Sequence, residues 1–137
     1  MQYLNEILGI KYPFIQGGMA NVATGAFAAA VSNAGALGII GSGGMNAEKL
    51  EEHIRICKSL TDKPFGVNLM LMNPDTSRMA ELVARSGVKV VTTGAGSPQK
   101  YVKMWKEAGI LVIPVCASVL LAQQLVRAGA DMIIAEG

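Results

Sequence analysis

The sequence has few cysteines, few aromatic residues, few charges and a single histidine. Its two cysteines, Cys57 and Cys116, lack the spacing of metal ligands and are too few for a disulfide framework. We therefore expect a reducing, cytoplasmic compartment and no metal site. Charged residues make up 16% of the chain, the net charge is +2 and no basic run occurs, which gives no case for nucleic acid or an anionic membrane as a partner.

Long apolar runs and targeting signals are also missing. The first residues, Met1 to Glu6, are not a basic region followed by an apolar core, and so they do not form a signal peptide. The longest apolar runs are far shorter than the roughly 20 residues that cross a membrane. The one histidine, His53, lies beside Glu52 and Arg55 in a predicted helix, where we expect it on the solvent side without a catalytic role.

Apolar residues dominate instead, in strands that alternate with helices. They fill 51% of the 137 positions, which is enough for one domain with a sizeable core. Apolar runs predict six strands, near residues 14–19, 37–40, 65–71, 88–93, 110–115 and 131–137. Helical periodicity and capping residues predict helices near residues 1–9, 26–33, 47–60, 73–86, 97–108 and 118–128.

Four predicted helices end in the same way. A small residue ends the helix, a glycine takes the left-handed position after it, and an apolar strand begins at once; the glycines are Gly35, Gly87, Gly109 and Gly129. The last three recur about every 20 residues, which leaves room for one strand and one crossover helix. Repeated units of this kind predict an α/β fold with a parallel sheet covered by helices.

Two architectures fit this pattern, an open doubly wound sheet and a TIM (β/α)₈ barrel. Glycines or polar residues follow nearly every strand, which favours the barrel because its active site is built from all the strand ends. Six strands are two short of closure, and open edges favour self-association. We therefore interpret residues 1–137 as the N-terminal portion of one barrel domain, with about six β/α units in a truncated or partial chain. A complete six-stranded open domain is the alternative.

The stretch Phe14–Met19 ends a short strand with a polar side chain and two glycines. Two adjacent residues without Cβ let a flat ligand lie against the backbone, and Met19 offers a soft side chain to a ring. We interpret this stretch as the floor of a flavin site to which later strands each add an edge; a tight strand-to-helix turn is the alternative. A dinucleotide site at Gly41–Gly44 is disfavoured, because the turn misses the G-x-G-x-x-G spacing.

Five stretches along the whole chain carry a family resemblance. They are Tyr12–Ala20, Leu37–Gly43, Thr61–Asn68, Val90–Gly96 and Gly129–Gly137. In these stretches the sequence resembles the FMN-dependent enoyl-acyl-carrier-protein reductase II enzymes and the closely similar nitronate monooxygenases, also called 2-nitropropane dioxygenases.

The resemblance implies a TIM barrel with FMN across the C-terminal ends of the strands. Asn68 would hydrogen-bond the polar edge of the ring, and Thr92 with the Thr93-Gly94-Ala95 backbone would border the substrate side. The cofactor-binding residues implied are Gly17, Gly18, Met19, Gly41, Ser42, Asn68, Thr92, Thr93, Gly94, Glu136 and Gly137. The family's catalytic histidine is expected directly after Gly137, and its phosphate-binding glycines in strands seven and eight. No catalytic residue is therefore implied within the 137 residues, and His53 is not a replacement.

The implied activity is that of an oxidoreductase. NADH or NADPH reduces FMN, which reduces trans-2-enoyl thioesters carried by acyl carrier protein in type II fatty-acid synthesis. Residues 61–71 and 92–96 favour this activity over the alternative, oxidation of alkyl nitronates by FMN and oxygen. The full-length protein is expected to be a homodimer, and the 137-residue chain alone is expected to be inactive. A third hypothesis is a non-catalytic barrel fragment that self-associates.

Overall fold

The computed structural model describes residues 2–137, in which helices and strands alternate after two initial helices. The helices are α1 (Leu4–Leu8), α2 (Gly25–Asn33), α3 (Ala47–Leu60), α4 (Thr76–Ser86), α5 (Gln99–Glu107) and α6 (Val119–Ala128). The strands are β1 (Gly38–Gly41), β2 (Phe65–Met70), β3 (Val90–Gly94), β4 (Leu111–Cys116) and β5 (Ile134–Ala135). Met1, which we predicted to open the first helix, lies outside the described residues.

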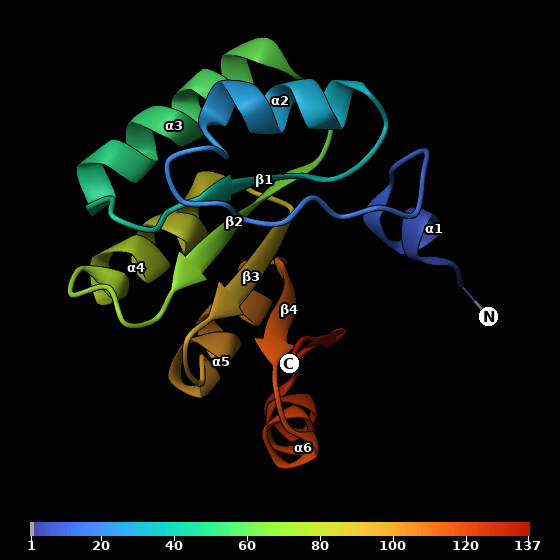
Figure 1. Ribbon diagram of the computed structural model, residues 1–137, viewed down its shortest axis with the longest axis vertical. Helices are drawn as coiled ribbons and strands as arrows, with labels where there is room; N and C mark the ends of the chain where they lie inside the picture. The colour runs from blue at the N-terminus through green and yellow to red at the C-terminus, as the bar shows by residue number, and fades with distance from the viewer. Residues whose placement is uncertain (1) are drawn as a thin grey trace.

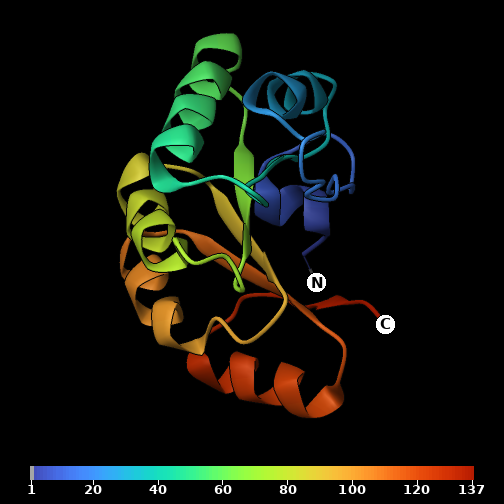
Figure 2. The ribbon, with the colours of Figure 1, turned by 60° about the vertical axis from the view of Figure 1, so that its left-hand side comes forward.

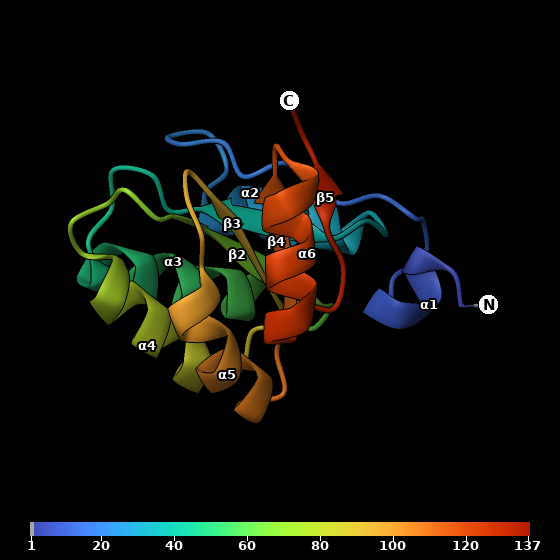
Figure 3. The same cartoon turned by 90° about the horizontal axis from the view of Figure 1, so that it is seen from below.

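The strands form one parallel sheet in which neighbours in sequence are neighbours in space, in the order β1-β2-β3-β4-β5 (Figure 1). This order has no reversal, so residues 2–137 lack the switch point of a doubly wound sheet. Helices α3, α4 and α5 cover one side of the sheet, and α1 lies on the other side (Figure 2). Helix α6 runs beside β4 at the curved end of the sheet (Figure 3). The expected α/β class with a parallel sheet is confirmed.

The expected count of six strands is wrong for the described residues, because the first predicted strand is reduced to one bridge. Ile15 pairs with Leu37, and the ladder stops there. Beyond this bridge, the side chain of Gln16 replaces the main chain as the hydrogen-bond partner of β1. Its Oε1 accepts from the Ile39 N–H at 2.9 Å, and its Nε2 donates to the Ile39 carbonyl at 3.0 Å. Because a side chain satisfies the edge of β1, the main chain from Gly17 onward is free to leave the sheet.

The sheet separates the apolar core into two layers. The layer between the sheet and the helices is the larger and includes Trp105, Leu50 and Val67. The indole Nε1 of Trp105 donates to the Ala80 carbonyl at 3.0 Å, which satisfies its only polar atom. The inner face carries the smaller cluster of Leu8, Leu37, Ile39, Val90 and Ile113. No helix among residues 2–137 is long and apolar enough to span a membrane.

Local sequence signals set the helix ends as predicted. Thr24, Asn46 and Ser118 cap α2, α3 and α6 with their side chains, at 3.1, 2.9 and 3.2 Å from the accepted N–H groups. The four predicted glycines all adopt a left-handed conformation, with φ between 78° and 114°. Each turns the chain from a helix toward the next strand, where a side chain at that φ would be strained.

The expectation that His53 faces solvent is wrong. The side chain is half-buried, and its Nδ1 accepts a hydrogen bond from the Gly25 N–H at 3.0 Å. Gly25 is the first residue of α2, and the N–H groups in the first turn of a helix have no partner within that helix. His53 therefore joins α3 to the start of α2 and has a structural role.

The close contact between α2 and α3 at Gly25 predicts the effect of adding one methyl group there. A Cβ at Gly25 would lie well within 3.0 Å of the main-chain oxygen of His53, a distance that real Cβ atoms do not show. We expect Gly25→Ala to lower the free energy of unfolding by about 3 kcal/mol, since the helices must separate. Urea denaturation measures the change. Gly17→Ala is the matched control, because a Cβ there meets nothing within 4 Å; equal midpoints for the two variants would contradict the prediction.

Candidate functional site

A pocket of about 610 Å³ opens on the inner face, where the carboxyl ends of the strands meet. Its volume lies within the roughly 300–1,000 Å³ of small-molecule sites. The polar side chains in its wall are Gln16, Asn68, Thr92 and Glu136, and Leu4, Ile15, Val115 and Ile134 form an apolar part. Because parallel strands end at the same edge, residues far apart in sequence converge here.

Asn68 near the end of β2 is the centre of the wall. Its main-chain oxygen accepts from Ser42, from the N–H at 3.2 Å and from Oγ at 2.6 Å. Its side-chain Oδ1 accepts from the Thr92 hydroxyl at 2.8 Å. Asn68 is thereby held by the residue after β1 and by its register partner in β3.

Two glycines at or beside the pocket wall, Gly18 and Gly41, are needed for close approach. A Cβ at Gly18 would lie 2.5 Å from the Cβ of Asn68. The N-terminal segment can therefore approach Asn68 this closely only because residue 18 is a glycine. A Cβ at Gly41 would lie 2.7 Å from the Met19 carbonyl oxygen, so the segment also lies directly on the end of β1. Gly17 has open space around its α-carbon. The result is a stretch of main chain without side chains, Gly17-Gly18, beside the Asn68 amide.

The structure brings six of the predicted cofactor residues to this pocket and leaves five outside its wall. Those in the wall are Gly17, Gly18, Asn68, Thr92, Gly94 and Glu136. Those outside it are Met19, Gly41, Ser42, Thr93 and Gly137. Gly41 is covered by the Met19 backbone, Ser42 is fully buried against Asn68, and Gly137 is exposed beyond β5.

Thr93 differs from Thr92 because side chains alternate along a strand. Val90 of β3 belongs to the inner cluster and Val91 to the helix-side layer, so Thr92 faces the pocket and Thr93 faces the helices. Thr93 is completely buried, and its Oγ1 has no hydrogen-bond partner within residues 2–137. Of this pair, the side chain of Thr92 alone can reach a ligand in the pocket.

Several wall residues were not predicted from the sequence, among them Leu4, Met70 and Val115. Met70 and Val115 lie at the ends of β2 and β4, and period-2 alternation from a known inward residue could have found them. Leu4 comes from α1, and only the folded chain places it there. Ala95 adopts a left-handed conformation with φ 60°, which a non-glycine residue rarely does and which its sequence does not signal.

The ionisable groups of the chain limit what the pocket can do. Burial raises the pKa of the Cys57 thiol to about 12 and also raises the pKa of Cys116, so both thiols are protonated at neutral pH. No three His, Cys, Asp or Glu side chains in the described part of the chain could hold a metal ion. The described pocket wall contains no lysine, arginine or histidine. Its side-chain chemistry is therefore that of two neutral amides, a hydroxyl and one carboxyl group.

These features fit the ring of the flavin that the resemblance implies. Gly17 and Gly18 have no side chains to keep a ring away from the backbone, and the Asn68 amide can bond the polar edge of a ring. The described wall does not fit the phosphate of FMN in the same way, because it offers no cationic side chain to pair with that group. The described pocket wall thus has groups that suit a ring and no cationic side chain for the phosphate.

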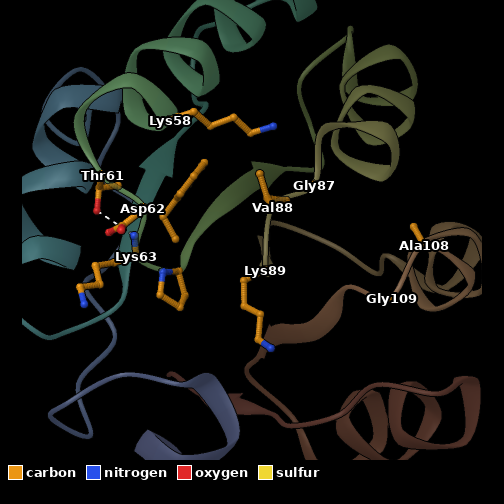
Figure 4. A pocket seen from close by; sticks show the side chains of 11 residues that line it. Lys58, Thr61, Asp62, Lys63, Gly87, Val88, Lys89, Ala108 and Gly109 are labelled. Atoms are coloured by element: carbon orange, nitrogen blue, oxygen red, sulfur yellow. Dashed lines mark hydrogen bonds between the residues drawn. The ribbon is translucent and has the colours of Figure 1, made fainter.

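A second hollow, of about 490 Å³, lies at the opposite end of the sheet (Figure 4). It is formed by the turns that precede β2 and β3 and includes Lys58, Asp62, Lys63 and Lys89. Lys58 reaches across from α3 and donates to the Ser86 carbonyl at the end of α4. Turns at this end of a parallel sheet contribute to stability, whereas chemistry is carried at the carboxyl ends.

Comparison with known proteins gives consistent relatives. A model of the nitronate monooxygenase family matches residues 1–84 and 76–137. The solved structure of FabK from Thermotoga maritima matches with a TM-score of 0.95 and 48% identity, over 98% of this chain and 43% of that chain.

Two curated proteins are also similar. A methyl-oxo-octahydro-indene-carboxyl-CoA dehydrogenase of Mycobacterium tuberculosis is 38% identical over 134 residues, which are 98% of this chain and 38% of that protein. A nitronate monooxygenase of Paraburkholderia phytofirmans is 52% identical over 71 residues, which are 52% of this chain and 19% of that protein. The chain thus spans about two fifths of the length of the first of these relatives.

The left-handed Ala95 gives a prediction for this edge of the pocket. This conformation costs an L-residue roughly 1–2 kcal/mol, and glycine does not carry that cost. We expect Ala95→Gly to raise the free energy of unfolding by about 1 kcal/mol, measured by urea denaturation. Ala84→Gly within α4 is the control and should lower it by about 0.5–1 kcal/mol. If both variants lose stability, Ala95 is not strained.

Proposed function

The chain belongs to the nitronate monooxygenase family, and from this premise we propose that it is the N-terminal part of an FMN-dependent enoyl-acyl-carrier-protein reductase with a TIM-barrel domain. The observation that carries the proposal is the similarity to FabK, an enoyl-acyl-carrier-protein reductase II, across nearly the whole chain. The Mycobacterium relative is named for a carboxyl-CoA substrate, which is also a thioester. The substrate proposed here is a trans-2-enoyl thioester.

The residues of the pocket have distinct roles in this proposal. The Gly17-Gly18 backbone supports one face of the flavin ring, and Asn68 bonds its polar edge. Thr92, Gly94 and Glu136 border the remaining rim. The apolar side chains, Ile15 and Ile134 among them, exclude water from the inner face. FMN, when bound, supplies the electron chemistry, and the protein supplies position and polarity. We assign no catalytic residue to this chain.

The partners follow from the same proposal. NADH or NADPH is the co-substrate, and acyl carrier protein delivers the enoyl group. The full-length protein acts in the cytoplasm as a homodimer. The 137-residue chain alone is inactive, since the site described above serves the ring and offers the phosphate no cationic side chain.

Oxidation of alkyl nitronates by FMN and oxygen is the second candidate. The name of the matching family model and the 52% identity to the Paraburkholderia enzyme favour it. A flat ring against Gly17-Gly18 and an amide at its edge serve either reaction, because both use the same cofactor. A non-catalytic, self-associating barrel fragment is the third, favoured by the sheet edge at β5.

Turnover with two substrates tests the choice of reaction. We expect the native gene product that carries this chain, loaded with FMN, to oxidise NADH faster with crotonyl thioester than to consume oxygen with an alkyl nitronate. Both rates are followed spectroscopically, and FMN-free protein is the control for each. Faster turnover of the nitronate would reverse the order of the two candidates.

Flavin titration of the 137-residue chain tests the ring site separately. Each charge-assisted bond to phosphate would contribute about 1.5–3 kcal/mol, or more than tenfold in Kd. Since no cationic side chain lines the described pocket, we expect FMN and riboflavin to bind with equally weak affinity. Gly18→Ala should weaken both ligands alike, because it displaces Asn68. Stoichiometric copurification of FMN would contradict this prediction and the third candidate together.

A further inference from the structure

We infer that Thr92 is a positioning residue whose hydroxyl fixes the carboxamide of Asn68, so that the Nδ2 amide presents a hydrogen-bond donor to the pocket. A carboxamide has one accepting and one donating end, and a bond at one end decides where the other points. The identity of the ligand rests on the proposed function. The orientation of Asn68 does not.

The two ends of the Asn68 amide have different surroundings. Oδ1 accepts from the Thr92 hydroxyl at 2.8 Å. Nδ2 faces the N-terminal segment, where it would lie 3.2 Å from a Cβ built on Gly18. No acceptor among residues 2–137 bonds this nitrogen, although the neighbouring Oδ1 and main-chain oxygen are both engaged. The unused donor capacity of Asn68 is therefore at the pocket side.

Thr92 is itself well fixed. It lies opposite Asn68 in the register of β2 and β3 and is only 4% exposed. Ser42 holds the main-chain oxygen of Asn68 from the other side, with its N–H and its Oγ. Backbone and side chain of Asn68 are thus both held before any ligand arrives. Preorganisation of this kind removes the cost of ordering the side chain on binding.

The donor defines which part of a ligand can meet Asn68. It must be an acceptor, such as a ring carbonyl oxygen or an unprotonated ring nitrogen, and a ligand N–H would be rejected. For a flavin, a donor at such an edge favours the reduced ring, which is the more electron-rich form. Loss of the orientation should therefore weaken flavin binding and make its midpoint potential more negative.

Adjacent positions in β3 supply matched variants. Thr92→Val removes the hydroxyl and keeps the branched shape, and Thr92→Ser keeps the hydroxyl. Thr93→Val makes the same change one residue along, where the side chain faces the helices and its hydroxyl bonds nothing in the described chain. A general effect of removing a buried hydroxyl from β3 would appear in both valine variants, whereas an effect through Asn68 would appear in Thr92→Val alone.

Side-chain ¹⁵N relaxation of Asn68 in the 137-residue chain tests the positioning without any ligand. We expect a wild-type order parameter near the rigid value of about 0.85, and a fall below about 0.6 in Thr92→Val. Thr92→Ser should restore it, and Thr93→Val should leave it unchanged. A mobile amide in the wild type, or an unchanged one in Thr92→Val, overturns the inference. If Thr92→Val does not fold, the order parameter of the Asn68 side chain in the wild type still decides whether this side chain is held in place.

Flavin measurements on the native gene product test the donor. Thr92→Val should raise the Kd for FMN about three- to tenfold, the value of one hydrogen bond, and shift the midpoint potential to more negative values. Thr92→Ser should restore both. An unchanged Kd and potential, with FMN bound, overturns the donor role. Wild-type protein that binds no FMN overturns the proposed function, and the relaxation data then still decide the positioning.

Discussion

Asn68 is the point at which three parts of the chain are joined. Its main-chain oxygen holds Ser42 after β1, its side chain holds Thr92 of β3, and its Cβ leaves room beside it for a glycine alone, Gly18. The carboxyl edge of the sheet and the N-terminal segment are therefore fixed by the same residue. Because these contacts are short and specific, they fix the main chain of Gly18 next to the Asn68 amide.

Small residues make the approach of these segments feasible. Gly18 meets Asn68, Gly41 meets the Met19 backbone, and Gly25 meets the main chain of His53. At each of these positions a methyl group would occupy space already taken by another part of the chain. These three glycines thus permit close contact, whereas Gly35, Gly87, Gly109 and Gly129 form left-handed helix ends.

The groups in the pocket wall suit a planar ring better than they suit a phosphate. The neutral wall around Asn68 and Thr92 suits a planar ring with acceptors at its edge. A phosphate calls for backbone N–H groups or cations, and the described wall has no cationic side chain. The chain spans about two fifths of the length of its Mycobacterium relative.

The sequence by itself determined the features that depend on neighbours along the chain. The bounds of α3 and the left-handed glycines were predicted correctly, because propensity and capping act over a few residues. The two glycines at the end of the Phe14–Met19 stretch were visible in the linear pattern, whereas Asn68 and Thr92 were indicated by the family resemblance.

The tertiary structure alone decided the features that depend on contacts across the fold. Gln16 ends the first strand through its side chain, His53 is drawn into the crossing of α2 and α3, and Ser42 and Thr93 are turned away from the pocket. Each depends on a partner 20 or more residues away or on the face that a strand presents. A local pattern does not contain that partner, and so the geometry of the site was fixed only when the chain folded.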